Sequence, residues 1–220
     1  MKLTIPTELS EITVLQWQKY QTAIKESQEE SFINLALVSI FCDIPVRDAL
    51  TIPVAELKDT AAIIATTISN KPRFIQRFAI DGTEYGFIPN LDRMTASEYI
   101  DLDTYVSDPD SIANAMAVMF RKITDKSFTM YRIEDYNDTE AERPERVQAM
   151  LNAPIEVYLG AMVFFYNLSN DLLKATLHFI QQPTTEAQGE IADLQKNGVG
   201  ISQYTRLLEE TLRISRRQLG

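Results

Sequence analysis

The apolar residues in the first third of the chain recur at the spacing of α-helices. The first predicted helix carries them three or four positions apart, at Val14, Trp17, Tyr20 and Ile24. Residues 32–42 are apolar on nearly every side, which is typical of a helix buried inside a domain. A third helix is predicted to begin near Pro53, a residue favoured in the first helical turn, and to continue to Asn70.

Alternating apolar and polar residues follow this helical region and predict strands. Residues 74–80 and 84–88 both alternate, and Asp81 and Gly82 lie between them. This dipeptide tolerates positive φ angles and is among the strongest sequence signals for a β-hairpin. A second pair of short strands is predicted within residues 127–133.

Residues 95–120 contain two sequence signals for the start of a helix. Thr95 and Glu98 have the spacing of a capping box, which predicts a short helix that ends near Tyr105. Asp108 begins a further segment with helical spacing, and the predicted helix includes Phe120.

The C-terminal part of the chain contains the longest predicted helix, residues 155–180. It is apolar nearly all round over residues 157–168 and should therefore be the central core helix. Residues 181–200 are polar and contain proline and glycine, as in a linker. The final predicted helix, residues 201–220, carries one apolar stripe of Ile201, Tyr204, Leu208 and Leu212. The predicted fold class is α+β and predominantly α-helical: a helical core domain (residues 1–180) with a small antiparallel β-hairpin, a linker and a C-terminal amphipathic helix.

The overall charge argues against binding to nucleic acid. The formal net charge is −10 at pH 7, and direct contact with phosphates depends on Lys and Arg. The most apolar window, residues 157–168, is shorter than the ~20 residues of a membrane span. The first 13 residues lack the apolar core of a signal peptide. We therefore expect a soluble protein in the cytoplasm, with no membrane contact.

Few residues have the chemistry of a catalytic or metal site. The single cysteine, Cys42, lies in an apolar run, and the single histidine, His178, has no nucleophile motif beside it. Glu98, Asp101 and Asp103 could ligate Mg²⁺ or Ca²⁺, but the two aspartates point to different sides of a helix. Their spacing also lacks the pattern of a calcium-binding loop. We predict no enzyme activity, no cofactor and no metal.

Charge is unevenly distributed, which suggests contact between proteins. Residues 81–110 contain eight acids and one base, whereas the last 25 residues contain five bases and two acids. Such complementarity steers association. The predicted partner-binding residues are Glu98, Asp101, Asp103 and Asp108 in the acidic segment, and Ile201, Tyr204, Leu208, Leu212, Arg213 and Arg216 in the tail. The tail helix either packs on its own domain or binds in a groove of a partner.

Four stretches together resemble proteins of tailed bacteriophages. They are LTIPTELSEITVLQWQKY (3–20), YGFIPNLDRMTASEYIDLDTYVSD (85–108), AMAVMFRKI (115–123) and VYLGAMVFFYNLSNDLL (157–173). The tail-assembly proteins that they resemble carry an acidic EYIDLD segment, an AVLYRP-like segment and a GAxxFFYNLGxELL-like helix. This chain lacks the proline after Arg121, and Ser169 and Asn170 replace a glycine and an acid. The resemblance implies a protein-binding factor in virion assembly and identifies no active site.

Three functions follow from the residues and the resemblance. The first is a tail assembly chaperone or adaptor that acts in the host cytoplasm on a tail or neck protein. The alternative is a structural component of the virion, such as a neck, ring or baseplate adaptor. An acidic DNA mimic that inhibits a host nuclease is a third hypothesis. Self-association into a homo-oligomer is compatible with the first two.

Overall fold

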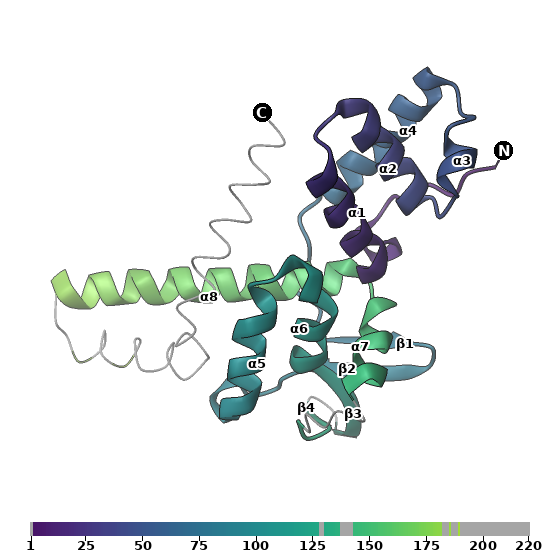
Figure 1. Cartoon of the computed structure of the whole chain (residues 1–220). Helices are drawn as coiled ribbons and strands as arrows, with labels where there is room; N and C mark the ends of the chain where they lie inside the picture. Colours follow the sequence, from purple (N-terminus) through teal and green to yellow (C-terminus); the bar gives the residue numbers. More distant parts are fainter. Residues whose placement is uncertain (1, 128–129, 137–142, 182–184, 186–188, 190–220) are drawn as a thin grey trace.

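The protein consists of helices and a four-stranded antiparallel sheet (Figure 1). The computed structural model describes residues 2–127, 130–136 and 143–181, together with Thr185 and Gly189. The α-helices are α1 (Val14–Glu26), α2 (Glu30–Phe41), α3 (Val46–Ala49), α4 (Val54–Ile68), α5 (Ala96–Val106), α6 (Ile112–Met119), α7 (Arg143–Leu151) and α8 (Ile155–Gln181). The strands are β1 (Arg77–Ile80), β2 (Thr83–Phe87), β3 (Phe120–Ser127) and β4 (Met130–Ile133), and the 3-10 turns are η1 (Leu9–Glu11), η2 (Leu91–Arg93) and η3 (Pro109–Ser111). The predicted α+β class with predominant helix is confirmed.

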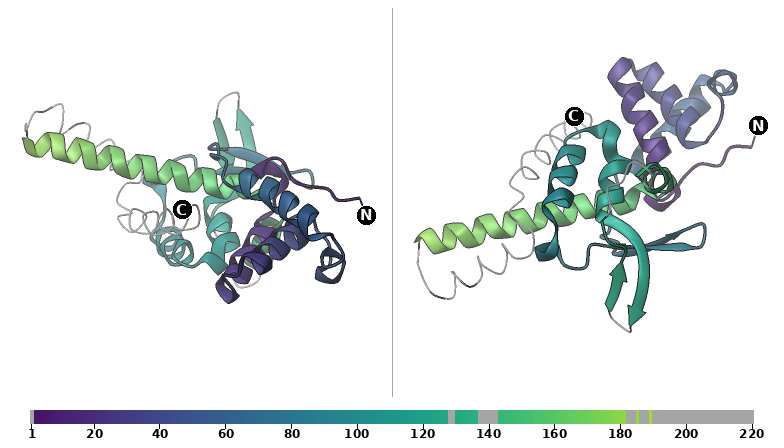
Figure 2. Two further views of the ribbon diagram at one scale, coloured as in Figure 1. Left: turned by 90° about the horizontal axis from the view of Figure 1, so that it is seen from above. Right: turned by 60° about the horizontal axis from the view of Figure 1, so that its bottom comes forward.

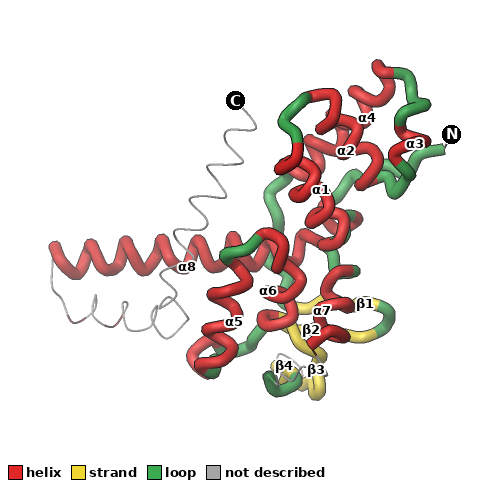
Figure 3. Tube along the Cα trace, in the orientation of Figure 1, coloured by secondary structure: helices red, strands yellow, loops and turns green. Residues whose placement is uncertain are grey.

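The helices α1 to α4 form one group, which lies apart from the strands in Figure 3. Thr13 caps α1: its Oγ1 accepts a hydrogen bond from the backbone N–H of Gln16 at 3.2 Å, and the Gln16 side chain accepts one from Thr13 N at 2.9 Å. This reciprocal pair is a capping box, and it sets the first turn of the helix. The rings of Tyr20 and Phe41 then join α1 to α2 at a centroid distance of 5.3 Å.

The first hairpin forms where the sequence predicts it. Asp81 and Gly82 adopt φ angles of 48° and 79°, so both turn residues are left-handed. Such a turn matches the twist of the two strands that it joins. In the sheet order β1-β2-β3-β4, β1 pairs with β2 from Arg77↔Gly86 to Ile80↔Thr83.

The second strand pair is longer than the sequence predicts. Phe120, expected in a helix, begins β3 instead, and β3 ends at Ser127. The cause is tertiary, because Phe120 and Lys122 pair with residues of β2, which supplies the hydrogen-bonding partners of the strand. Figure 2 shows the two hairpins, β1–β2 and β3–β4, pointing in different directions.

The long helix α8 connects the helical group to the sheet. Its first residue, Ile155, donates a backbone hydrogen bond to the carbonyl of Ile12 at 2.8 Å. Further along, Gly160 lies so close to the backbone carbonyl of Arg73 that a Cβ would overlap it. The C-terminal half of α8 extends beyond the other described elements in Figures 1 and 2.

Aromatic rings fill the contact between α8 and the sheet. Phe164 of α8 stacks on Phe74 with centroids 4.5 Å apart, and Phe165 lies 5.8 Å from Phe87 of β2. Phe87 also meets Phe120 at 5.3 Å, so the cluster continues into β3. Ring pairs at these distances stabilise a core beyond the area that they bury.

Candidate functional site

The predicted acidic surface is divided by the fold into buried and exposed parts. Glu98 is a core residue at the start of α5, and its carboxylate accepts a hydrogen bond from Thr95 N at 2.6 Å. The capping box predicted from the sequence is therefore present. Because Glu98 is buried, its carboxylate serves the fold and does not face a partner.

The other oxygen of Glu98 binds Arg121, a residue that sequence reasoning did not identify. Arg121 Nη2 lies 2.5 Å from Glu98 Oε1, and the two side chains are only 6% and 4% exposed. Burial lowers the pKa of the Arg121 guanidinium, and the charge of Glu98 acts in the opposite direction. Arg121 Nε is buried and has no hydrogen-bond partner among the described residues. The sequence signal was weak, since Arg121 is one of three bases among the eight residues of β3.

Tyr136 links this ion pair to the surface. Its hydroxyl donates to Asp101 Oδ2 at 2.6 Å. The guanidinium carbons of Arg121 and Arg146 lie 5.7 and 5.6 Å from the centroid of the same ring, within cation–π range. Asp101 is therefore held in place from within the fold and is half-buried.

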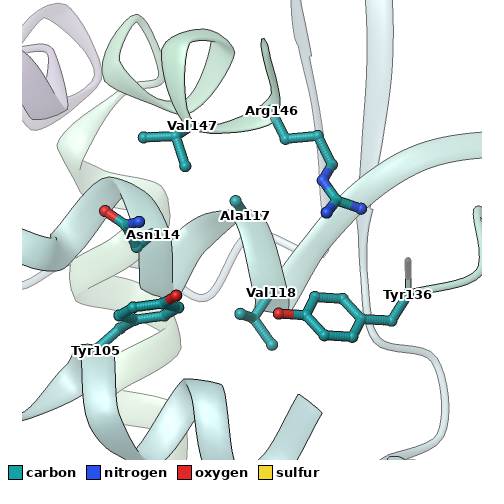
Figure 4. A pocket seen from close by; sticks show the side chains of 7 residues that line it. All are labelled: Tyr105, Asn114, Ala117, Val118, Tyr136, Arg146 and Val147. Atoms are coloured by element: carbon teal, nitrogen blue, oxygen red, sulfur yellow. The ribbon is translucent and has the colours of Figure 1, made fainter. Parts of the chain in front are cut away.

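A small cavity lies beside Tyr136 (Figure 4). Tyr105, Ala117, Val118, Asn114, Arg146 and Val147 complete its lining. The cavity volume is about 10 Å³, which is the scale of a single water molecule. Sites for small ligands usually have ~300 Å³ or more, so this cavity does not accommodate a metabolite.

A larger hollow lies between α1 and η3. It has about 410 Å³, is open to solvent and is lined by Gln18, Lys19, Thr22 and Asp110. Asp110 is paired there with Lys25 at 3.1 Å. The hollow is lined by four polar side chains without a converging set of donors, which is not the pattern of a ligand site.

Asp103 and Asp108 lie nearer the solvent than Glu98 does. Asp108 caps η3 and accepts a hydrogen bond from the Ser111 hydroxyl at 2.7 Å. This bond, together with one from Asp110 N, lowers the pKa of Asp108. Asp103 is half-buried on α5, and Asp108 is exposed. The structure thus brings these two, but not Glu98, to the surface.

The described part of the chain offers few residues for a metal site or for a reactive nucleophile. Over those residues, no group of three or more His, Cys, Asp or Glu side chains could hold a metal ion. Cys42 is buried, and burial raises the pKa of its thiol. A raised pKa leaves less of the reactive thiolate at neutral pH.

Three exposed apolar residues lie close together in the chain around α3, and none of them was predicted as a binding residue. Val46, Leu50 and Val54 are 53%, 67% and 70% exposed and lie within nine consecutive residues around α3. We call these three residues the α3 apolar surface. Exposed apolar residues that gather in one patch are typical of sites of protein–protein contact. Their spacing of four residues, from the residue after Pro45 to the residue after Pro53, was the available signal.

Other exposed apolar side chains are dispersed. Ile63 lies on α4, Ile100 on α5 and Met130 on β4. Single exposed residues of this kind are normal and indicate no site.

The predicted tail residues Ile201, Tyr204, Leu208, Leu212, Arg213 and Arg216 lie outside the described residues. Their role stays a prediction.

Comparisons with known proteins return no relative. No family model, curated protein or solved structure matches the chain. Among the helices of the described residues, none combines the length and apolar character that crossing a membrane requires. The candidate site therefore rests on this chain's own geometry, and its strongest feature is the α3 apolar surface.

Proposed function

We propose that the protein is a non-enzymatic binding factor that contacts another protein through the α3 apolar surface. The exposure of Val46, Leu50 and Val54 carries this proposal. Covering them would remove apolar area from water, which is the main favourable term in protein association. The two hollows support the same view: the cavity beside Tyr136 is too small for a substrate, and the open hollow between α1 and η3 has no converging set of polar groups.

The resemblance to tail-assembly proteins suggests the setting. In this proposal the partner is a tail or neck protein of a tailed bacteriophage. The protein acts as an assembly chaperone or adaptor in the host cytoplasm. A place in the finished virion is the alternative.

Site-specific photo-crosslinking tests the surface. A crosslinking amino acid replaces Leu50 in cells that produce the phage, and mass spectrometry identifies the attached protein. The matched control places the same amino acid at Met130, which is 73% exposed but lies on β4. We expect a tail or neck protein to be attached at Leu50 and not at Met130. Equal attachment at both positions, or none at either, would contradict the proposal.

Mass spectrometry of purified particles distinguishes the two roles. A chaperone should be absent from particles, whereas a neck, ring or baseplate component should be present in a fixed ratio to known virion proteins.

The DNA-mimic hypothesis receives less support from the fold. A mimic needs carboxylates that are free to replace phosphates, but several acids of residues 81–110 form ion pairs with other residues of the same chain. Glu98 pairs with Arg121, Glu84 with Lys126 and Asp110 with Lys25.

A further inference from the structure

The surroundings of the α3 apolar surface are acidic. Residues 26–59 contain seven acids and two bases, a net charge of −5. Both bases are already paired: Arg47 lies 3.3 Å from Asp48, and Lys58 lies 3.1 Å from Glu30. Two copies of this region would therefore repel each other, which argues against a symmetric contact between two α3 surfaces. A complementary partner needs apolar residues together with positive charge.

The C-terminal segment of this chain has both properties. Its apolar residues recur at helical spacing, and residues 201–220 contain four bases and two acids. An amphipathic segment of this kind can bind a surface through apolar anchors, while its charges direct the approach. Residues 201–220 therefore complement the α3 apolar surface both in apolar character and in charge.

The length of α8 indicates which molecule supplies the segment. α8 has 27 residues, about 40 Å at 1.5 Å per residue, and it begins beside α1. Its far end points away from α1 to α4 (Figures 1 and 2). Nineteen residues separate the end of α8 from residue 201, and a flexible chain of that length spans about 25 Å on average. Return to the molecule's own α3 would require a strongly extended chain, so a second molecule is the more accessible source.

We propose that the α3 apolar surface binds the C-terminal segment, residues 201–220, of a second copy of this chain. The inference rests on the proposed function, because it names an occupant for the same surface. A tail-to-surface contact joins different patches on the two copies. Such a contact repeats from molecule to molecule and builds open chains or rings.

Sedimentation velocity of the full chain over a range of concentrations tests this inference. The unmodified protein should form dimers and larger species, and raising the salt concentration should weaken them. Leu50→Asp damages the surface and Leu208→Asp damages the segment, so each variant alone should associate at least about tenfold more weakly. An equal mixture of the two variants should form a 1:1 dimer, because one supplies an intact segment and the other an intact surface. Met130→Asp is the matched control and should associate like the unmodified protein.

Several outcomes would overturn the inference. These are a monomer at every concentration, unchanged association of Leu50→Asp, or a mixture that stays monomeric. Thermal unfolding of Leu208→Asp at a concentration where the unmodified protein is monomeric provides a further check, since a lowered midpoint there would place the segment in its own core. Val54→Asp repeats the surface test independently of Leu50.

The two proposals can fail separately. Self-association is measured without any phage protein, whereas photo-crosslinking identifies a phage partner. Crosslinking of a tail or neck protein at Leu50 together with a monomeric chain would retain the function and reject the second copy as the occupant.

Discussion

Arg121 places a guanidinium in the core beside the carboxylate of Glu98. Replacing Arg121 with Ala would leave that carboxylate buried without its partner. We expect the free energy of unfolding to fall by about 3–5 kcal/mol, measured by urea denaturation. The control is Lys122→Ala, whose ion pair with Glu145 is exposed and should contribute less than about 1 kcal/mol. Equal effects of the two substitutions would show that the buried pair does not stabilise the fold.

Tyr158 provides a pH-dependent test at the same scale. Burial raises the pKa of Tyr158 above the value of about 10 that a tyrosine has in an unfolded chain. Below that value the phenol is neutral in both states, so its contribution to stability is constant. As the pH rises further the unfolded state ionises first, and the protein loses stability.

We therefore expect Tyr158→Phe to lose less stability than the unmodified protein between pH 9 and pH 11. Urea unfolding at several pH values measures the difference, with pH 8 as the reference for both proteins. Parallel curves would show that Tyr158 does not contribute to alkaline destabilisation.

At the scale of elements, the close packing of α8 against the backbone of Arg73 depends on Gly160. Gly160→Ala should favour the helix by about 1 kcal/mol from propensity alone. The added Cβ, however, would collide with the backbone carbonyl of Arg73, which cannot rotate away as a side chain can. We expect a net loss of about 1–3 kcal/mol in the free energy of unfolding.

The comparison for this prediction is Gly189→Ala, where no atom of the described residues lies within 4 Å of an added Cβ. That substitution should leave stability nearly unchanged in the same chemical denaturation assay. A Gly160→Ala variant at least as stable as the unmodified protein would mean that α8 and the Arg73 segment approach less closely.

For the whole molecule, the α3 apolar surface should be separable from the stability of the fold. Replacing Val46, Leu50 and Val54 together with Ser removes side chains that are mostly exposed. We expect the free energy of unfolding to change by less than about 1 kcal/mol, because surface substitutions seldom matter to stability. Thermal unfolding followed by circular dichroism measures this, with Val38→Ala in the buried part of α2 as the destabilising control. A large loss in the triple variant would assign these residues to the core.

Local signals in the sequence were sufficient for several features of the fold. Thr95 and Glu98 were predicted to begin a helix, and their capping box is complete in the structure. Asp81 and Gly82 form the predicted hairpin turn with positive φ angles. These features were predictable because their hydrogen bonds and backbone preferences involve residues that are close in the chain.

Tertiary contacts decided what local signals could not. Phe120 became a strand residue because β2 supplied a pairing edge, although its neighbours have helical spacing. The carboxylate of Glu98 was counted as part of an acidic surface, but Arg121, 23 positions further along, binds it in the core. Val46, Leu50 and Val54 look like ordinary apolar residues in the sequence, and only the packed fold shows that no described element covers them. Burial depends on which distant segments meet. Local sequence therefore determined the capping box at Thr95 and the turn at Asp81 and Gly82, and the tertiary structure decided where β3 begins and which side chains are exposed.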